Sequence, residues 1–134
     1  MAHAVAERCA AEGRPAAGTI LLDSYWPDEQ LYRSVLPRII GRLAEPDRAI
    51  GLGAAGLARL SAVGAYLRAF SDWIPRETTS PTLFIGAEIP LSGADVPPAR
   101  WLLPHDLVTV HASHFDLIDV QATAIAEAIE SWIG

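Results

Sequence analysis

Two residues that could perform acid–base chemistry, Asp23 and His114, stand at the ends of two separate apolar runs. Asp23 ends the run TILLD at 19–23, and His114 follows the run LVTVH at 107–111. A carboxylate that hydrogen-bonds to an imidazole orients the ring and makes it a general base, which completes two-thirds of a nucleophilic triad. The alternative is structural: Asp23 caps a turn, and His114 bonds to the backbone.

Whether the two side chains can meet depends on the elements that carry them. The runs 19–23, TLFIGA at 82–87 and 107–111 are apolar without alternation, which is typical of strands buried on both faces of a parallel sheet. Ligands and catalytic groups gather at the carboxyl ends of such strands. We therefore expect Asp23 and His114 to share one edge of a parallel sheet.

Helical patterns surround these strands, and Pro-rich residues 88–105 predict a long loop. Asp116 is expected to cap the last helix and Gly134 to end it. Pro37 is expected to kink the second helix, because proline lacks an amide donor. The expected helices span residues 2–12, 29–44, 56–71 and 117–133. This order predicts an α/β fold, a mostly parallel sheet flanked by helices.

Composition narrows the class of protein. The 134 residues suffice for one domain, and 51% of them are apolar. The net charge of −6 argues against a nucleic-acid surface, and the single cysteine, Cys9, excludes a disulfide framework. No apolar stretch is long enough for a membrane span, and charges interrupt the N-terminal segment where a signal peptide would need an apolar core. We therefore expect a cytoplasmic protein that binds neither nucleic acid nor membrane.

Other polar signals are weaker. Glu88 follows the strand 82–87 and is the rival to Asp23 as the acid. The glycines at 51–56 form a G-x-G-x-x-G pattern, but they follow a helix, whereas a dinucleotide site needs a strand there. His105, Asp106 and His111 do not complete a ligand set, so no metal is expected.

Several blocks of the sequence together carry a resemblance. LLDSYWPDEQ, LSAVGAYLRAF, WIPRETTSPTLFIGA and LVTVHASHFDLIDVQATAIAEAIESWIG resemble, in order and spacing, the terminal thioesterase domain of modular type I polyketide synthases. The likeness covers residues 1–134 and the C-terminal part of that domain. It implies an α/β-hydrolase that takes a polyketide chain from an acyl carrier protein onto a serine. The chain then leaves by macrolactonisation or by hydrolysis.

The resemblance also implies roles for individual residues. Asp23 takes the place of the triad acid, and His114 lies in the family's histidine turn, in the order acid then histidine. Tyr25 and Gln30 take the places of residues that line the substrate channel. Residues of about 27–72 would form a lid over that channel. No cofactor is implied, because the substrate arrives on the phosphopantetheine arm of the carrier protein.

The family's nucleophile is the serine of a Gly-x-Ser-x-Gly turn, and no serine of this chain lies in that pattern. We therefore expect the chain to be inactive alone, with the serine in an upstream half of the same domain that precedes Met1. Two alternatives stay open. One is a nonribosomal-peptide or editing thioesterase, and the other is a non-catalytic remnant, or the partner-binding half of a split α/β-hydrolase.

Overall fold

The computed structural model describes all residues except 30, 44–53, 90, 92–95 and 97. The chain divides into two compact units. The first joins Met1–Trp26 to Pro75–Gly134, and the second is Pro27–Ile74. The candidate site lies in the first unit.

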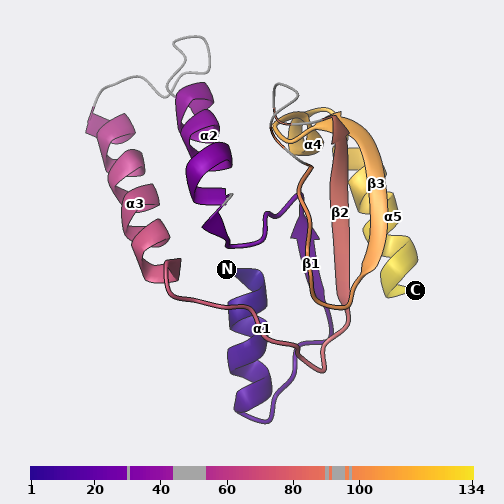
Figure 1. Ribbon diagram of the computed structural model, residues 1–134. Coiled ribbons are helices and arrows are strands. Elements are labelled where there is room, and N and C mark those ends of the chain that lie inside the picture. Colours follow the sequence, from indigo (N-terminus) through magenta and orange to yellow (C-terminus); the bar gives the residue numbers. More distant parts are fainter. Residues whose placement is uncertain (30, 44–53, 90, 92–95, 97) are drawn as a thin grey trace. The chain divides into compact units, whose positions relative to one another are not determined.

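The first unit is built on a three-stranded parallel sheet. Its strands are β1 (Thr19–Leu22), β2 (Thr82–Ile89) and β3 (Asp106–Ser113), in the order β1-β2-β3 (Figure 1). Each expected strand forms, with β2 and β3 a little longer than their apolar runs. The expectation that all three are buried on both faces is wrong for β3, most of whose residues are exposed or half-buried, because it lies at one side of the three-stranded sheet. Because the strands are parallel, their carboxyl ends lie at one edge of the sheet, as predicted.

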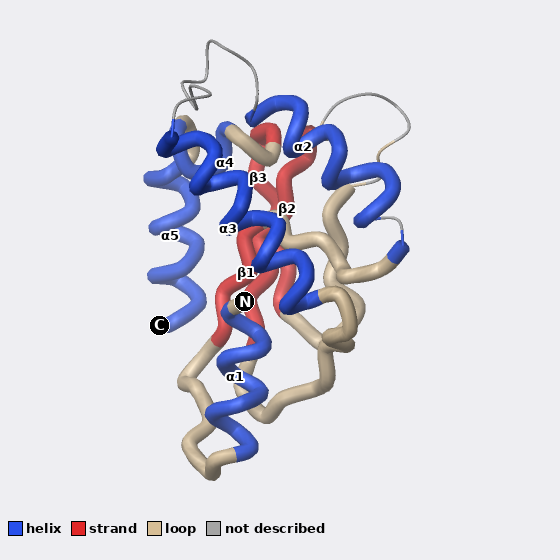
Figure 2. Tube along the Cα trace, turned by 90° about the vertical axis from the view of Figure 1, so that its left-hand side faces the viewer, coloured by secondary structure: helices blue, strands red, loops and turns tan. Residues whose placement is uncertain are grey.

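The central strand carries most of the core. Six consecutive residues of β2, from Thr82 to Ala87, are buried, which agrees with its uninterrupted apolar run. Helix α5 (Ala122–Ile133) covers one face of the sheet (Figure 2). One cluster of buried residues spans these elements: Leu83, Ile85, Ala87, Val110, Ala112, Leu117 and Ile125. Burial of this apolar surface stabilises the layered arrangement.

Helix α1 (Ala2–Ala11) contacts β1 and ends as predicted before Gly13, which has a φ of +73°. The expected helix at 117–133 is wrong in one respect: it forms as two helices, α4 (Asp116–Asp119) and α5. The prediction that Asp116 caps it is also wrong. Asp116 lies inside α4, and its carboxylate accepts a hydrogen bond from the Ser113 hydroxyl, so it does not cap the helix amides. Gly134 ends α5 as predicted, with its N–H bonded to the Glu130 carbonyl at 3.1 Å.

The second unit contains η1 (Leu31–Val35), α2 (Leu36–Leu43) and α3 (Ala54–Phe70). Residues 31–35 form a π-helical turn just before Pro37, at the expected irregularity. Proline supplies no amide donor to the helix ladder, which accounts for the departure from α-helical geometry there. That this unit forms a lid stays a prediction, and the glycines at 51–53 lie outside the described residues.

None of the helices in the described part of the chain has the length and apolar character needed to cross a membrane.

Candidate active site

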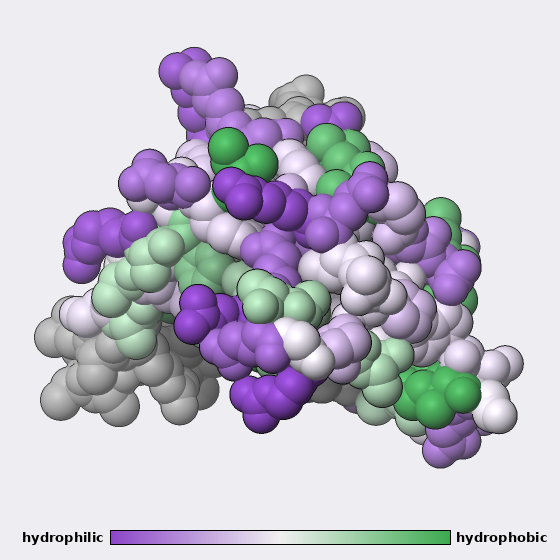
Figure 3. Space-filling view, turned by 90° about the horizontal axis from the view of Figure 1, so that it is seen from below, coloured by the Kyte–Doolittle hydropathy of each residue, from purple (hydrophilic) through white to green (hydrophobic). Residues whose placement is uncertain are grey.

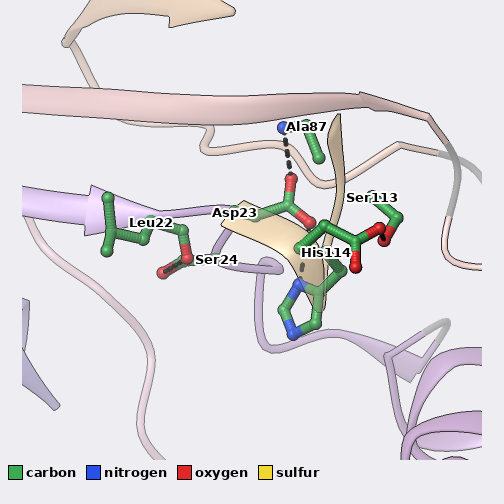
Figure 4. Close-up of polar contacts among 7 residues, drawn as sticks. Leu22, Asp23, Ser24, Ala87, Ser113 and His114 are labelled. Carbon is green, nitrogen blue, oxygen red and sulfur yellow. Dashed lines mark hydrogen bonds and ion pairs between the residues drawn. The ribbon is translucent and has the colours of Figure 1, made fainter. Parts of the chain in front are cut away.

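Asp23 is held in place by backbone bonds at the carboxyl end of β1. Its N–H donates to the carbonyl of Ile85 at 2.7 Å, which extends the β1–β2 ladder by one residue. Its side chain is almost fully buried, and Oδ1 accepts the N–H of Ala87 at 2.8 Å (Figure 4). Asp23 also has a φ of +39°, a left-handed conformation that costs most residues energy. The fold therefore holds this carboxylate in one orientation.

His114 meets the free oxygen of that carboxylate. Its Nδ1 lies 2.8 Å from Oδ2 of Asp23. Because an ionised carboxylate only accepts hydrogen bonds, Nδ1 must carry the proton in this contact. Nε2 of the neutral ring is then an acceptor, and in Figure 4 it points away from Asp23. The His114 side chain is 26% exposed, so a reacting group can approach it.

Two aromatic side chains flank the imidazole. The Phe115 ring lies at 5.3 Å between centroids and nearly perpendicular to it, and the Tyr25 ring lies at 6.1 Å. Burial, followed by the negative charge of Asp23, raises the pKa of the Tyr25 hydroxyl to about 12. Tyr25 is therefore a neutral hydroxyl beside the pair at physiological pH. Gln30, the other residue expected to line a channel, lies outside the described residues.

Glu88, the rival acid, has a different partner. Its Oε2 lies 3.0 Å from Nδ1 of His111, and both side chains are exposed, at 47% and 83%. Such a surface pair is screened by water and contributes little to stability. Asp23 is instead buried and bonded to His114. The hydrogen bonds therefore favour Asp23 as the partner of His114.

His105 and Asp106, two of the other polar residues that the sequence analysis names, lie away from Asp23 and His114 and line a cavity. A cavity of about 440 Å³ opens where β2 and β3 begin, lined by residues 77–82 and 103–106 with His3. It is at the opposite edge of the sheet from Asp23 and His114. Seen from that end, hydrophilic residues are interspersed with separate hydrophobic patches (Figure 3). Across the described ranges, no three His, Cys, Asp or Glu side chains gather as a metal site would require.

No side chain that could act as a nucleophile is bonded to the pair among the described residues. Within that part of the chain, no serine, threonine or cysteine forms a hydrogen bond with His114. The two nearest serines in sequence are engaged elsewhere: Ser24 donates to the Leu22 carbonyl at 3.3 Å, and Ser113 donates to Asp116. The arrangement can orient an imidazole base and accept a proton from a group that approaches Nε2.

Sequence reasoning missed two contacts at this site. The backbone amide of Ala87 carries no side-chain signature, so nothing in the sequence points to its bond with Asp23. The bond between Ser113 and Asp116 does have a signal, because a serine three residues before an acid commonly closes a turn at a helix start. The position of Asp116 before an apolar run predicts instead that it caps the helix amides.

The fold and the site together define an α/β protein with a carboxylate–imidazole pair at the carboxyl edge of a parallel sheet. Over its whole length the chain is similar to polyketide synthase proteins. It is 33% identical over 137 residues to polyketide synthase GfsE of Streptomyces halstedii. It is 34% identical over 145 residues to the spectinabilin polyketide synthase system protein NorC of Streptomyces orinoci, and equally to erythronolide synthase EryA3 of Saccharopolyspora erythraea.

These alignments cover 99–100% of this chain but only 4–6% of each relative. No protein-family model matches the chain. The chain is thus related to one small region of very long polyketide synthase proteins.

Proposed function

We propose that this chain carries the acid and base of a serine α/β-hydrolase-type thioesterase in polyketide biosynthesis. The enzyme would release an acyl chain from an acyl carrier protein, by macrolactonisation or by hydrolysis. The observation that carries the proposal is the bond between buried Asp23 and partly exposed His114 at the carboxyl edge of the sheet. The similarity to polyketide synthase proteins supports this choice of substrate class.

In this mechanism His114 accepts and then donates a proton in each of two half-reactions. Nε2 of His114 accepts the proton of a serine hydroxyl as that oxygen attacks the thioester carbonyl. His114 then gives the proton to the departing sulfur as the carbon–sulfur bond breaks, which leaves an acyl-serine and a free thiol. In the second half, His114 takes a proton from water or from a hydroxyl of the acyl chain. The proton passes to the serine oxygen, and an acid or a lactone leaves.

Asp23 does not itself take up the proton. Its carboxylate keeps the Nδ1–H tautomer of His114 and stabilises the imidazolium that forms in each half-reaction. The bond from the Ala87 amide leaves Oδ2 free for this task. Tyr25 would line the route of the acyl chain, since its ring lies beside the imidazole.

The serine would come from polypeptide outside residues 1–134, because none of the chain's serines lies in a Gly-x-Ser-x-Gly pattern. A decisive test extends the reading frame upstream of Met1 to include such a motif. Hydrolysis of an acyl N-acetylcysteamine thioester is then measured. We expect turnover by the extended protein and at least about a 1000-fold lower kcat in His114→Ala.

His111→Ala is the matched control, because His111 is also a β3-region histidine paired with a carboxylate but exposed. Its kcat should equal that of the unmodified protein. Three results would overturn the proposal: an upstream frame without the motif, full turnover in His114→Ala, or equal losses in both variants. The first of these would favour a non-catalytic, partner-binding chain.

A further inference from the structure

The turn that carries His114 is closed by side chains. Ser113 is the last residue of β3, and Asp116 is the first residue of α4. The Ser113 hydroxyl donates to Oδ2 of Asp116 at 2.5 Å. A hydroxyl that donates to a carboxylate forms a charge-assisted hydrogen bond, which is stronger than one between two neutral groups. His114 and Phe115 form the two-residue bridge between them.

Both flanks of this turn are fixed by the core. Ala112, just before Ser113, is 4% exposed, and Leu117, just after Asp116, is 2% exposed. Both belong to the buried cluster that also contains Ala87, whose amide holds Asp23. The acid and the base are therefore both anchored to one packed region, and the turn that carries His114 connects two buried residues of that region.

We infer that Ser113 and Asp116 are positioning residues for His114. Their bond keeps the turn closed, so that Nδ1 stays within hydrogen-bonding distance of Asp23 while Nε2 faces outward. The expected effect on kcat rests on the proposed function. The expected effect on the contact between His114 and Asp23 does not depend on it. Loss of the bond lets the turn open, and a shift of about 1 Å in a catalytic group can cost about 100-fold in rate.

The chain offers variants that separate the hydrogen bond from the charge. Ser113→Ala and Asp116→Ala each remove the bond. Ser113→Thr keeps a hydroxyl donor, and Asp116→Asn keeps an acceptor oxygen while removing the negative charge. Ser24→Ala is the matched control, because Ser24 adjoins Asp23 but donates only to the Leu22 carbonyl.

The first readout is the proton on Nδ1 of His114, observed by NMR in the 134-residue chain. A ring proton shared with a carboxylate is shifted far downfield and exchanges slowly with water. We expect this signal in the unmodified chain, Ser24→Ala, Ser113→Thr and Asp116→Asn. We expect its loss or broadening in Ser113→Ala and Asp116→Ala. Circular dichroism identifies any variant that fails to fold, and the two conservative variants then carry the test.

The second readout is kcat of the upstream-extended protein, expected to fall at least about 10-fold in Ser113→Ala and Asp116→Ala and to recover in the conservative variants. The double variant should be no worse than either single one, because both remove the same bond. An unchanged Nδ1 signal in Ser113→Ala overturns the inference. A lost signal with no thioesterase turnover in any protein upholds the positioning role and overturns the proposed function.

Discussion

Asp23 and Ala87 are joined by a hydrogen bond from the backbone amide of β2 to the carboxylate that follows β1, at 2.8 Å. The bond is buried, and it occupies one carboxylate oxygen so that the other faces His114. A backbone donor is present at residue 87 for every side chain except that of proline. The orientation of the acid is thus determined by strand pairing, and substitutions of Asp23 itself are the sharpest probe of the site.

Asp23→Asn should abolish most of the activity of the upstream-extended protein while keeping its fold. An asparagine amide has only one acceptor oxygen, so it cannot accept from both the Ala87 N–H and the His114 Nδ1–H. When its oxygen accepts from Ala87, its NH₂ group faces Nδ1 of His114. The wrong tautomer of His114 is then favoured, and kcat should fall by about 10,000-fold, the size of this effect in a serine-protease triad. Thioester hydrolysis measures it, with Glu88→Gln as the control. Equal losses in the two variants would contradict the assignment of Asp23 as the acid.

Tyr25 should make stability depend on pH in the alkaline range. Burial, and to a lesser extent the charge of Asp23, raise its pKa from 10.0 to about 12. The unfolded chain then loses this proton first as pH rises, so the contribution is fully present below about pH 10 and is lost by about pH 12. Unfolding free energies of the unmodified chain and Tyr25→Phe, measured across this range, should converge as pH increases. Parallel curves would show that Tyr25 has an ordinary pKa.

Two side chains of helix α1 bond to the backbone of Arg76, and we expect these bonds to stabilise the fold. Nε2 of His3 bonds to the Arg76 carbonyl at 2.8 Å, and Oε1 of Glu7 accepts the Arg76 N–H at 2.5 Å. Glu7→Ala should lower the free energy of unfolding by about 1–3 kcal/mol and speed hydrogen exchange of the Arg76 amide.

The control for this tether is Glu12→Ala. Glu12 pairs with Arg8 and Arg14, all with well-exposed side chains, and such pairs contribute at most about 1 kcal/mol. Denaturant unfolding and exchange at residue 76 should hardly change in this variant. A Glu7→Ala protein that matches Glu12→Ala in both measurements would show that the tether contributes nothing.

Leu117 should matter more to stability than its short helix suggests. It is 2% exposed and packs in the core directly after the histidine turn. Leu117→Ala should cost about 2–5 kcal/mol, through lost burial and the cavity left behind. Leu107→Ala is the matched control, because Leu107 is 60% exposed on β3 and should change stability by less than about 0.5 kcal/mol. Similar thermal unfolding of the two variants would place Leu117 outside the core.

Much of the fold could be predicted because it depends on local patterns. The run TLFIGA has no polar alternation, and a strand of this kind is stable only when both faces are covered, which favours a central parallel strand. Gly13 and Gly134 adopt positive φ at helix ends, a conformation that glycine tolerates without strain. The partner of Asp116 could not be predicted, because Asp116 can bond to the helix amides or to Ser113 and its spacing does not choose between them.

By itself, the sequence determined the class of fold, its three parallel strands and the edge of the sheet at which Asp23 and His114 must appear, since these follow from the apolar runs and from the common direction of parallel strands. Only the tertiary structure decided which carboxylate the imidazole meets. Asp23 and Glu88 both follow strands, and the choice between them rests on burial, on the amide of Ala87 and on the direction in which each side chain leaves the pleated sheet. Those quantities arise from contacts between segments far apart in the chain, which no local pattern encodes.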